Sequence, residues 1–133
     1  MRIYIAYKFS NNADKEGLKR ELQELSDKLI SWGHETFILG RDVKKWQHVH
    51  FGTITLIPLI FKNLRKCDYM VAYVNSNVPS KGLMFEVIIS KLIGKKSSLI
   101  LVNGTRADKL RDNFSKVAQV DSLAQLQKNQ VLD

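Results

Sequence analysis

The sequence predicts one α/β domain with a parallel sheet covered by helices on both faces. Short apolar segments alternate with helical segments along the whole chain, as in strands joined by crossover helices. The chain has 133 residues and contains no repeat, low-complexity tract or linker. Residues 1–133 are therefore expected to form one domain with one core.

The first strand and the first helix have clear patterns. Arg2 to Tyr7 has the composition of a strand, and Ile3 and Ile5 share one of its faces with Tyr7. After a loop, leucines recur at helical spacing on one face, at Leu18, Leu22, Leu25 and Leu29. Charged residues are expected on the other face of this helix, at Glu16, Lys19, Glu21, Glu24 and Lys28. Gly33 ends the helix.

The next segments are less regular. Residues 35–39 predict a short second strand closed by Gly40, and residues 41–52 show no period and predict a long loop. Loops of this length in compact domains are often functional. Residues 54–66 predict a helix with Pro58 in its first turn or at a kink.

The second half continues the alternation. Residues 69–74 predict a third strand, residues 81–93 an apolar helix stopped by Gly94, and residues 99–102 a fourth strand. Shorter elements complete the chain: a helix at 106–113, an edge strand at 117–120 and a last helical turn or two at 122–128. The predicted architecture is a three-layer, doubly wound, five-stranded parallel sheet of the flavodoxin or Rossmann type.

In such sheets, ligands bind outside the carboxyl ends of the strands, where the strand order reverses. The topology alone places four groups of residues at this edge, one after each of the first four strands. They are Tyr7, Lys8, Phe9 and Ser10; Gly40 to Trp46, with Arg41 and Asp42; Asn75 to Gly82; and Asn103 to Thr105.

The basic excess limits the expected partners. The chain holds 21 Lys and Arg against 13 Asp and Glu, a formal charge of +8, which favours anionic partners. The basic residues are scattered and no nucleic-acid-binding motif is present, so nucleic acid is not an expected partner. The excess indicates either a phosphorylated small molecule or simply a soluble basic surface.

Disulfide, metal and membrane functions are not expected. Cys67 is the only cysteine, and His48 and His50 lack a third clustered ligand, so no metal or other cofactor is predicted. The longest apolar run, residues 54–61, is shorter than a membrane span. The N-terminus has no signal-peptide cleavage site, so a cytoplasmic location is expected.

Glu86 is the most informative single residue. It is the only charged residue between Lys81 and Lys91, in an otherwise apolar helix. Gly82, one turn earlier, leaves open space in front of the carboxylate, and Ser80 is a candidate N-cap whose helix end could bind an anion. One interpretation makes Glu86 a nucleophile or general base. The other makes Gly82, Glu86 and Ser90 the polar stripe of a surface helix.

Several segments resemble the nucleoside 2-deoxyribosyltransferase family, including the related 2′-deoxynucleoside 5′-phosphate N-hydrolases. The resemblance covers roughly residues 1–103. It lies in Ile3-Tyr4-Ile5-Ala6, Asp68-Tyr69-Met70-Val71-Ala72, Ser80-Lys81-Gly82-Leu83-Met84-Phe85-Glu86 and Gly94-Lys95-Lys96. It implies cleavage or transfer at the N-glycosidic bond of a nucleoside or nucleotide, with Glu86 as the nucleophile in a retaining mechanism.

The resemblance also implies roles for other residues. Tyr4 would orient Glu86, and Ser80 and Gly82 would hold the sugar or its 5′ end. Asn103 follows the fourth strand, at a position where a neighbouring subunit often completes the site, so a homodimer or higher homo-oligomer is expected. Tyr7, Lys8, Phe9 and Arg41 are expected substrate contacts at the same edge.

Two departures from the family pattern stand out. The family usually carries a second aspartate in or near the helix before strand three, but residues 54–66 contain no acid. Asp42 would substitute for it, with Trp46 stacking on the base; equally, Asp42 is a turn or capping residue. Met84 replaces a glycine common in the family, which narrows the pocket.

Two alternatives stay open. The first-strand loop, the Arg41-Asp42 turn and residues 80–86 also resemble TIR domains, some of which use a helix glutamate to cleave NAD while others act in protein interaction. The missing aspartate, in turn, suggests a sensor that binds a nucleotide without turning it over.

Overall fold

The computed structural model describes residues 1–7, 15–43, 45–46, 52–76, 81–102 and 104–132. Five strands form one sheet in the order β2-β1-β3-β4-β5, and every pair of neighbours is parallel. The strands are β1 (Arg2–Tyr7), β2 (Glu35–Ile38), β3 (Tyr69–Val74), β4 (Lys96–Val102) and β5 (Lys116–Val120). The strand order reverses between β1 and β3, which confirms the predicted doubly wound sheet.

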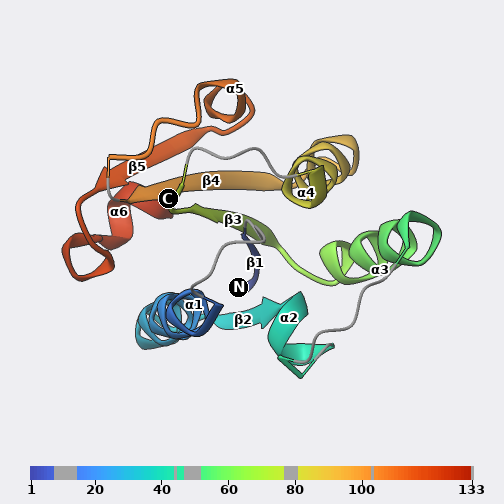
Figure 1. Ribbon diagram of the computed structural model, residues 1–133, viewed down its shortest axis with the longest axis horizontal. Helices are drawn as coiled ribbons and strands as arrows, with labels where there is room; N and C mark the ends of the chain where they lie inside the picture. The colour runs from blue at the N-terminus through green and yellow to red at the C-terminus, as the bar shows by residue number, and fades with distance from the viewer. Residues whose placement is uncertain (8–14, 44, 47–51, 77–80, 103, 133) are drawn as a thin grey trace.

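Helices cover both faces of the sheet (Figure 1). On one face lie α1 (Lys15–Ser31), the short η1 (Leu123–Gln125) and α6 (Lys128–Val131); on the other lie α3 (Thr53–Arg65) and α4 (Lys81–Leu92). Two further helices, α2 (Leu39–Asp42) and α5 (Asp108–Arg111), are a single turn each. The three layers therefore match the predicted architecture.

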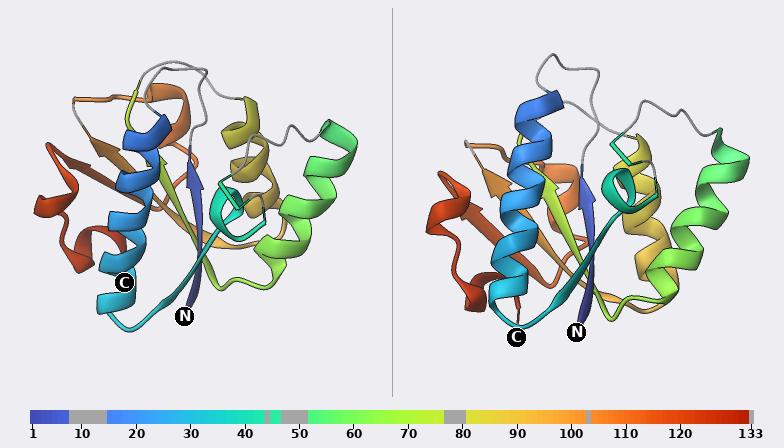
Figure 2. Two further views of the ribbon diagram at one scale, coloured as in Figure 1. Left: turned by 60° about the horizontal axis from the view of Figure 1, so that its bottom comes forward. Right: turned by 90° about the horizontal axis from the view of Figure 1, so that it is seen from below.

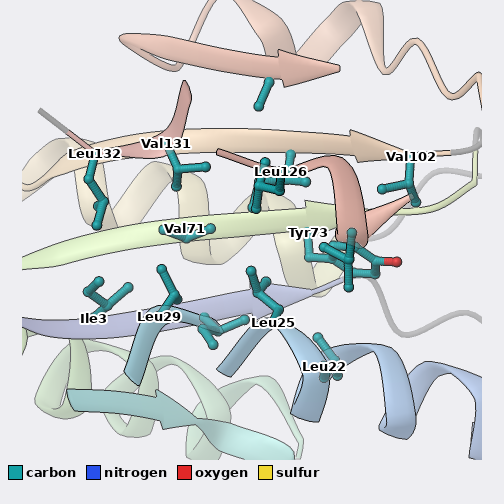
Figure 3. Close-up of a cluster of buried hydrophobic side chains, with 14 of the residues drawn as sticks. Ile3, Leu22, Leu25, Leu29, Val71, Tyr73, Val102, Leu126, Val131 and Leu132 are labelled. Carbon is teal, nitrogen blue, oxygen red and sulfur yellow. The ribbon is translucent and has the colours of Figure 1, made fainter. Parts of the chain in front are cut away.

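The alternation of side chains along the strands divides the core in two. In β1, Ile3 and Ile5 pack with the leucines of α1, whereas Tyr4 and Ala6 pack with α3 and α4. The six residues of β3 are all buried, as expected for a central strand covered on both faces. Figure 3 shows the α1 side of this core, with Leu22, Leu25 and Leu29 facing the strands.

The chain between β2 and α3 differs from the prediction. The second strand ends at Ile38 rather than at residue 39, and the predicted loop begins with the helical turn α2. The Asp42 carboxylate accepts a hydrogen bond from the Ile38 N–H at 2.8 Å, which satisfies a backbone donor at the start of this turn. A single turn has no hydrophobic period, so the pattern could not reveal it.

The C-terminal segment also differs from the one or two helical turns predicted at 122–128. It forms η1 and then α6, which packs against β4 and β5. The Tyr69 and Ser98 hydroxyls, both buried, donate hydrogen bonds to the Val131 carbonyl oxygen. The end of the chain is therefore attached to the middle of the sheet.

Two predicted helix stops are confirmed. Gly33 and Gly94 have φ values of 93° and 73°, in the left-handed region that favours glycine at helix C-termini. Pro58, in contrast, lies beyond the first turn of α3 and inside the helix. Among the described residues, no helix combines the length and apolar character needed to span a bilayer.

Candidate active site

The Tyr4 hydroxyl donates a hydrogen bond to the Glu86 carboxylate. Tyr4 lies in β1 and Glu86 lies in α4, the helix that follows β3. The two residues meet because the even-numbered side chains of β1 point to the face of the sheet that α3 and α4 cover. β1 and β3 are also the strands between which the strand order reverses, so the pair lies where doubly wound sheets bind ligands.

Glu86 is buried, with 8% of its surface exposed. Leu83 and Val87, on the same side of α4, are core residues, and Ser90 is 1% exposed. The stripe of Gly82, Glu86 and Ser90 therefore faces the interior, and the interpretation as a polar surface stripe is wrong. A buried carboxylate loses its hydration, so the Tyr4 hydroxyl offsets part of that cost.

Two phenols remain protonated beside this carboxylate. Burial and then the negative charge of Glu86 raise the pKa of Tyr4 well above its usual value. The same two causes raise the pKa of Tyr7 to about 12. Both hydroxyls are therefore available as hydrogen-bond donors throughout the physiological pH range.

Tyr7 lies against Gly40 and Trp46. A Cβ on Gly40 would collide with the Tyr7 hydroxyl and would lie 3.3 Å from the Trp46 ring, so an alanine at position 40 would force the tyrosine side chain to move. The backbone N–H of Trp46 donates a hydrogen bond to the Gly40 carbonyl oxygen at 2.8 Å. The structure thus brings together three residues that the topology placed at this edge.

The turn that carries Trp46 has an uncommon backbone. Lys45 and Trp46 have φ values of 54° and 59°, although neither is glycine. Non-glycine residues in this region are strained and often occur at functional sites. The partly exposed Trp46 ring also has the Lys19 ammonium 5.6 Å from its centroid, from the neighbouring helix α1.

Arg41 and Asp42 are part of the local framework. The Arg41 guanidinium donates to Ser26 Oγ at 2.9 Å and to the Thr36 carbonyl oxygen at 3.1 Å, which ties α2 to α1 and β2. It also forms an ion pair with Asp42 at 3.1 Å. Together with the bond from the Ile38 N–H, this gives Asp42 the contacts of a turn and capping residue, one of the two interpretations left open by the sequence.

Open space lies before Glu86 along α4. Apart from the backbone of α4 itself, no heavy atom of the described residues lies within 4 Å of a Cβ built on Gly82, one turn earlier. One turn later, the buried Ser90 hydroxyl has no hydrogen-bond partner in the described part of the chain. The other predicted contacts, Lys8, Phe9, Ser80 and Asn103, lie outside the described residues, as do His48 and His50. The described residues contain no group of three potential metal ligands.

The structure adds a polar cluster that the sequence did not reveal. The Asn75 amide donates to Glu21 Oε2 at 3.0 Å. Burial and then the nearby negative charge of Glu21 raise the pKa of the Tyr73 hydroxyl. Glu21 was predicted to lie on the outer face of α1. It lies three residues after Leu18 and four before Leu25, at the margin of the apolar stripe, and this spacing was the available signal.

No protein-family model matches this sequence, and no curated protein is significantly similar to it. Two solved structures have the same arrangement of elements. One is the CMP N-glycosidase BcmB of Clostridium botulinum, with a TM-score of 0.59, 18% identity and coverage of 90% of this chain and 88% of the other. The chain shares its fold with this protein.

The second structure is a 2-deoxyribosyltransferase from Bacillus psychrosaccharolyticus, with a TM-score of 0.60 and 22% identity. The alignment covers 88% of this chain and 85% of the other. Both neighbours are of the nucleoside 2-deoxyribosyltransferase-like kind that the sequence motifs resemble. The resemblance is therefore confirmed at the level of the fold.

Proposed function

We propose that this protein cleaves or transfers the N-glycosidic bond of a nucleoside or nucleotide, with Glu86 as the nucleophile. The observation that carries the proposal is the buried Tyr4–Glu86 pair at the edge where the strand order reverses. The names of the two structural neighbours, an N-glycosidase and a deoxyribosyltransferase, support the same bond as the target.

In the proposed first step, a Glu86 carboxylate oxygen attacks the anomeric carbon of the sugar. The bond from that carbon to the base nitrogen breaks, and the base leaves with the bonding electron pair and takes up a proton. The product is a glycosyl ester of Glu86. Tyr4 orients the carboxylate for this attack by donating to it.

In the second step, water or another base attacks the same carbon and releases the Glu86 carboxylate. Two inversions give net retention of configuration. Trp46 offers a partly exposed ring on which a base can stack, and Gly82 leaves room for the sugar in front of Glu86. Asp42 is proposed to assist the departing base.

The quaternary structure is part of the proposal. Four large apolar side chains are exposed on the outer faces of α3 and α4, at Ile54, Phe61, Ile88 and Leu92. Ile54 and Leu92 are 91% and 77% exposed. Apolar surface of this kind on neighbouring helices supports association with a second copy of the chain. A cytoplasmic location remains the expectation.

Release of free base tests the function directly. Deoxynucleosides, ribonucleosides, their 5′-monophosphates and NAD would each be incubated with the protein and with its Glu86→Gln variant, and the products separated by chromatography. A substrate that releases base with the wild type only supports the proposal. Binding without release would favour a sensor, and release from NAD alone would favour the TIR-like alternative.

Trapping tests the nucleophile. A nucleoside with fluorine at the sugar C2′ destabilises the positively charged transition states of both steps, and slows hydrolysis of the ester. The expected result is a mass increase equal to one fluorosugar on a peptide containing Glu86. Modification of another carboxylate would contradict the assignment.

A further inference from the structure

Glu21 lies in the half of α1 that borders the carboxyl ends of the strands (Figure 2). Its carboxylate accepts a hydrogen bond from the Asn75 amide at 3.0 Å, and it lies near enough to the Tyr73 hydroxyl that its charge, after burial, helps to raise the pKa of Tyr73. Figure 3 shows the Tyr73 hydroxyl pointing along β3 toward this edge. Residues from the end of β3 thus hold a carboxylate of α1 in a defined position.

Two neighbouring strands, β1 and β3, connect this cluster with the proposed nucleophile, Glu86. Tyr73 pairs in register with Tyr7 of β1, and the charge of Glu86 contributes to the raised pKa of Tyr7. The strand order reverses between these two strands, so α1 and α4 flank the same crevice from opposite faces. Each flanking helix therefore contributes one carboxylate, Glu21 from α1 and Glu86 from α4.

The chemistry of Glu21 determines what it can recognise. A carboxylate has about four lone-pair directions, and the hydrogen bond from Asn75 uses one of them. The Asn75 amide is an uncharged donor, and no ion pair of Glu21 occurs among the described residues. The remaining lone pairs suit a hydroxyl or amino group, whereas a phosphate at the same point would be repelled.

We propose that Glu21 determines substrate specificity by accepting a hydrogen bond from a hydroxyl or amino group of the nucleoside held at Glu86. This inference rests on the proposed function and adds a substrate class to it. The preferred substrate carries an uncharged donor group where it meets Glu21, with Tyr73 and Asn75 as positioning residues.

Matched pairs of ligands identify the donor group. Deoxycytidine against deoxyuridine tests the amino group of the base. Deoxycytidine against its 5′-monophosphate tests the 5′-hydroxyl, and deoxycytidine against 2′,3′-dideoxycytidine tests the 3′-hydroxyl. For each pair, kcat and KM for base release are measured with the wild type and with Glu21→Gln. Glu16→Gln, an exposed glutamate on the same helix, is the matched control.

For the pair that contains the recognised group, Glu21→Gln is expected to lower kcat/KM for the donor-bearing member by roughly 10- to 100-fold, mainly through KM. The partner without that group should change little, so the preference within the pair collapses. Glu16→Gln should leave all preferences unchanged. Tyr73→Phe, which leaves the Glu21 carboxylate in place, should weaken the same preference less.

A loss of equal size for every ligand, or no change in any preference, would overturn this inference while leaving the proposed function in place. If the wild type releases no base, calorimetric binding of the same pairs replaces turnover as the readout. A wild type that neither cleaves nor binds any of these ligands would remove the proposed function, and this inference with it.

Discussion

Tyr4 and Glu86, separated by 82 positions in the chain, share a buried hydrogen bond at the edge of the sheet. β1 supplies the donor and α4 the acceptor, so the bond depends on the pairing of β1 with β3 and on the packing of α4 over that pair. The proposed nucleophile on α4 is therefore oriented by a residue of β1, the neighbour of the strand β3 that precedes α4.

Replacing Tyr4 with phenylalanine is expected to lower both activity and stability. The variant keeps the ring, which packs against Phe37 at a centroid distance of 5.3 Å, and removes only the hydroxyl. The buried carboxylate then loses a donor, which costs about 1–3 kcal/mol of unfolding free energy. Urea unfolding measures this loss, and base release is expected to fall with kcat more than with KM. Unchanged activity would contradict the orienting role.

Gly40→Ala is expected to be destabilising, because its Cβ would collide with the Tyr7 hydroxyl. Tyr7→Phe removes that hydroxyl, so the double variant should be more stable than the effects of the two single variants predict. The coupling free energy from this double-mutant cycle is the measurement. Strictly additive effects would show that the hydroxyl does not lie over Gly40.

Gly82→Ala tests whether the open space before Glu86 holds the ligand, because the substitution should fill that space without destabilising the fold. A Cβ at this position meets no atom of the described protein, so the fold should tolerate it and unfolding free energy should stay the same or rise by up to about 1 kcal/mol. The methyl group would occupy the space proposed for the sugar, so KM should rise. A rise in KM without loss of stability is the expected combination, and unchanged kinetics would place the ligand elsewhere.

The tyrosine side chains predict an alkaline transition. The pKa of Tyr7 rises from its usual 10.0 to about 12 on folding, so the native state binds this proton more tightly than the unfolded chain does. Its contribution to stability is therefore complete below about pH 10 and is lost as pH rises toward about 12. Denaturant unfolding across this range measures the loss.

Burial is the larger cause of that shift, and Glu86→Gln tests the second cause, the charge of Glu86. The charge of Glu86 raises the pKa of both Tyr4 and Tyr7, so removing it should lower both pKa values. Tyrosinate absorbance should then appear at lower pH than in the wild type. Glu16→Gln removes the charge of an exposed glutamate on α1 and serves as the control. Identical titration curves for all three proteins would contradict the electrostatic link.

The exposed apolar residues of α3 and α4 predict association in solution. Phe61→Glu adds a charge to this surface without disturbing a buried residue. Sedimentation velocity is expected to show a dimer or larger oligomer for the wild type and a smaller species for the variant. Ala124→Glu, at an exposed residue of η1 on the opposite face, makes the same change in charge and is the control. A monomeric wild type would end the proposal of self-association.

The fold could be predicted because the long helices show apolar residues at helical spacing and the strands are short apolar runs. Leu22, Leu25 and Leu29, for example, face the sheet as their spacing indicated. The turn at α2 escaped prediction because it is held by the Asp42 side chain, which bonds the N–H of Ile38 just before the turn, and not by a hydrophobic period. Helix η1 and α6 were merged for a similar reason, since each is very short.

The candidate site was predicted unevenly. The position of Glu86 could be inferred from a lone charge in an apolar helix, and its burial agrees with that inference. Glu21 was missed because helical spacing alone does not tell whether a margin residue faces solvent or a neighbouring strand end. The hydrogen bond from Asn75 and the proximity of Tyr73 depend on the pairing of β3, which lies far from α1 in the chain.

The attachment of α6 to the sheet has a practical meaning for anyone handling this protein. The Val131 carbonyl is bound by Tyr69 and Ser98, which belong to β3 and β4. A variant that ends at Gln130 would lack this acceptor, and Tyr69 and Ser98 would keep only the hydrogen bond between their own hydroxyls. Because both hydroxyls are buried in β3 and β4, this truncation should destabilise the centre of the sheet, not merely shorten a tail.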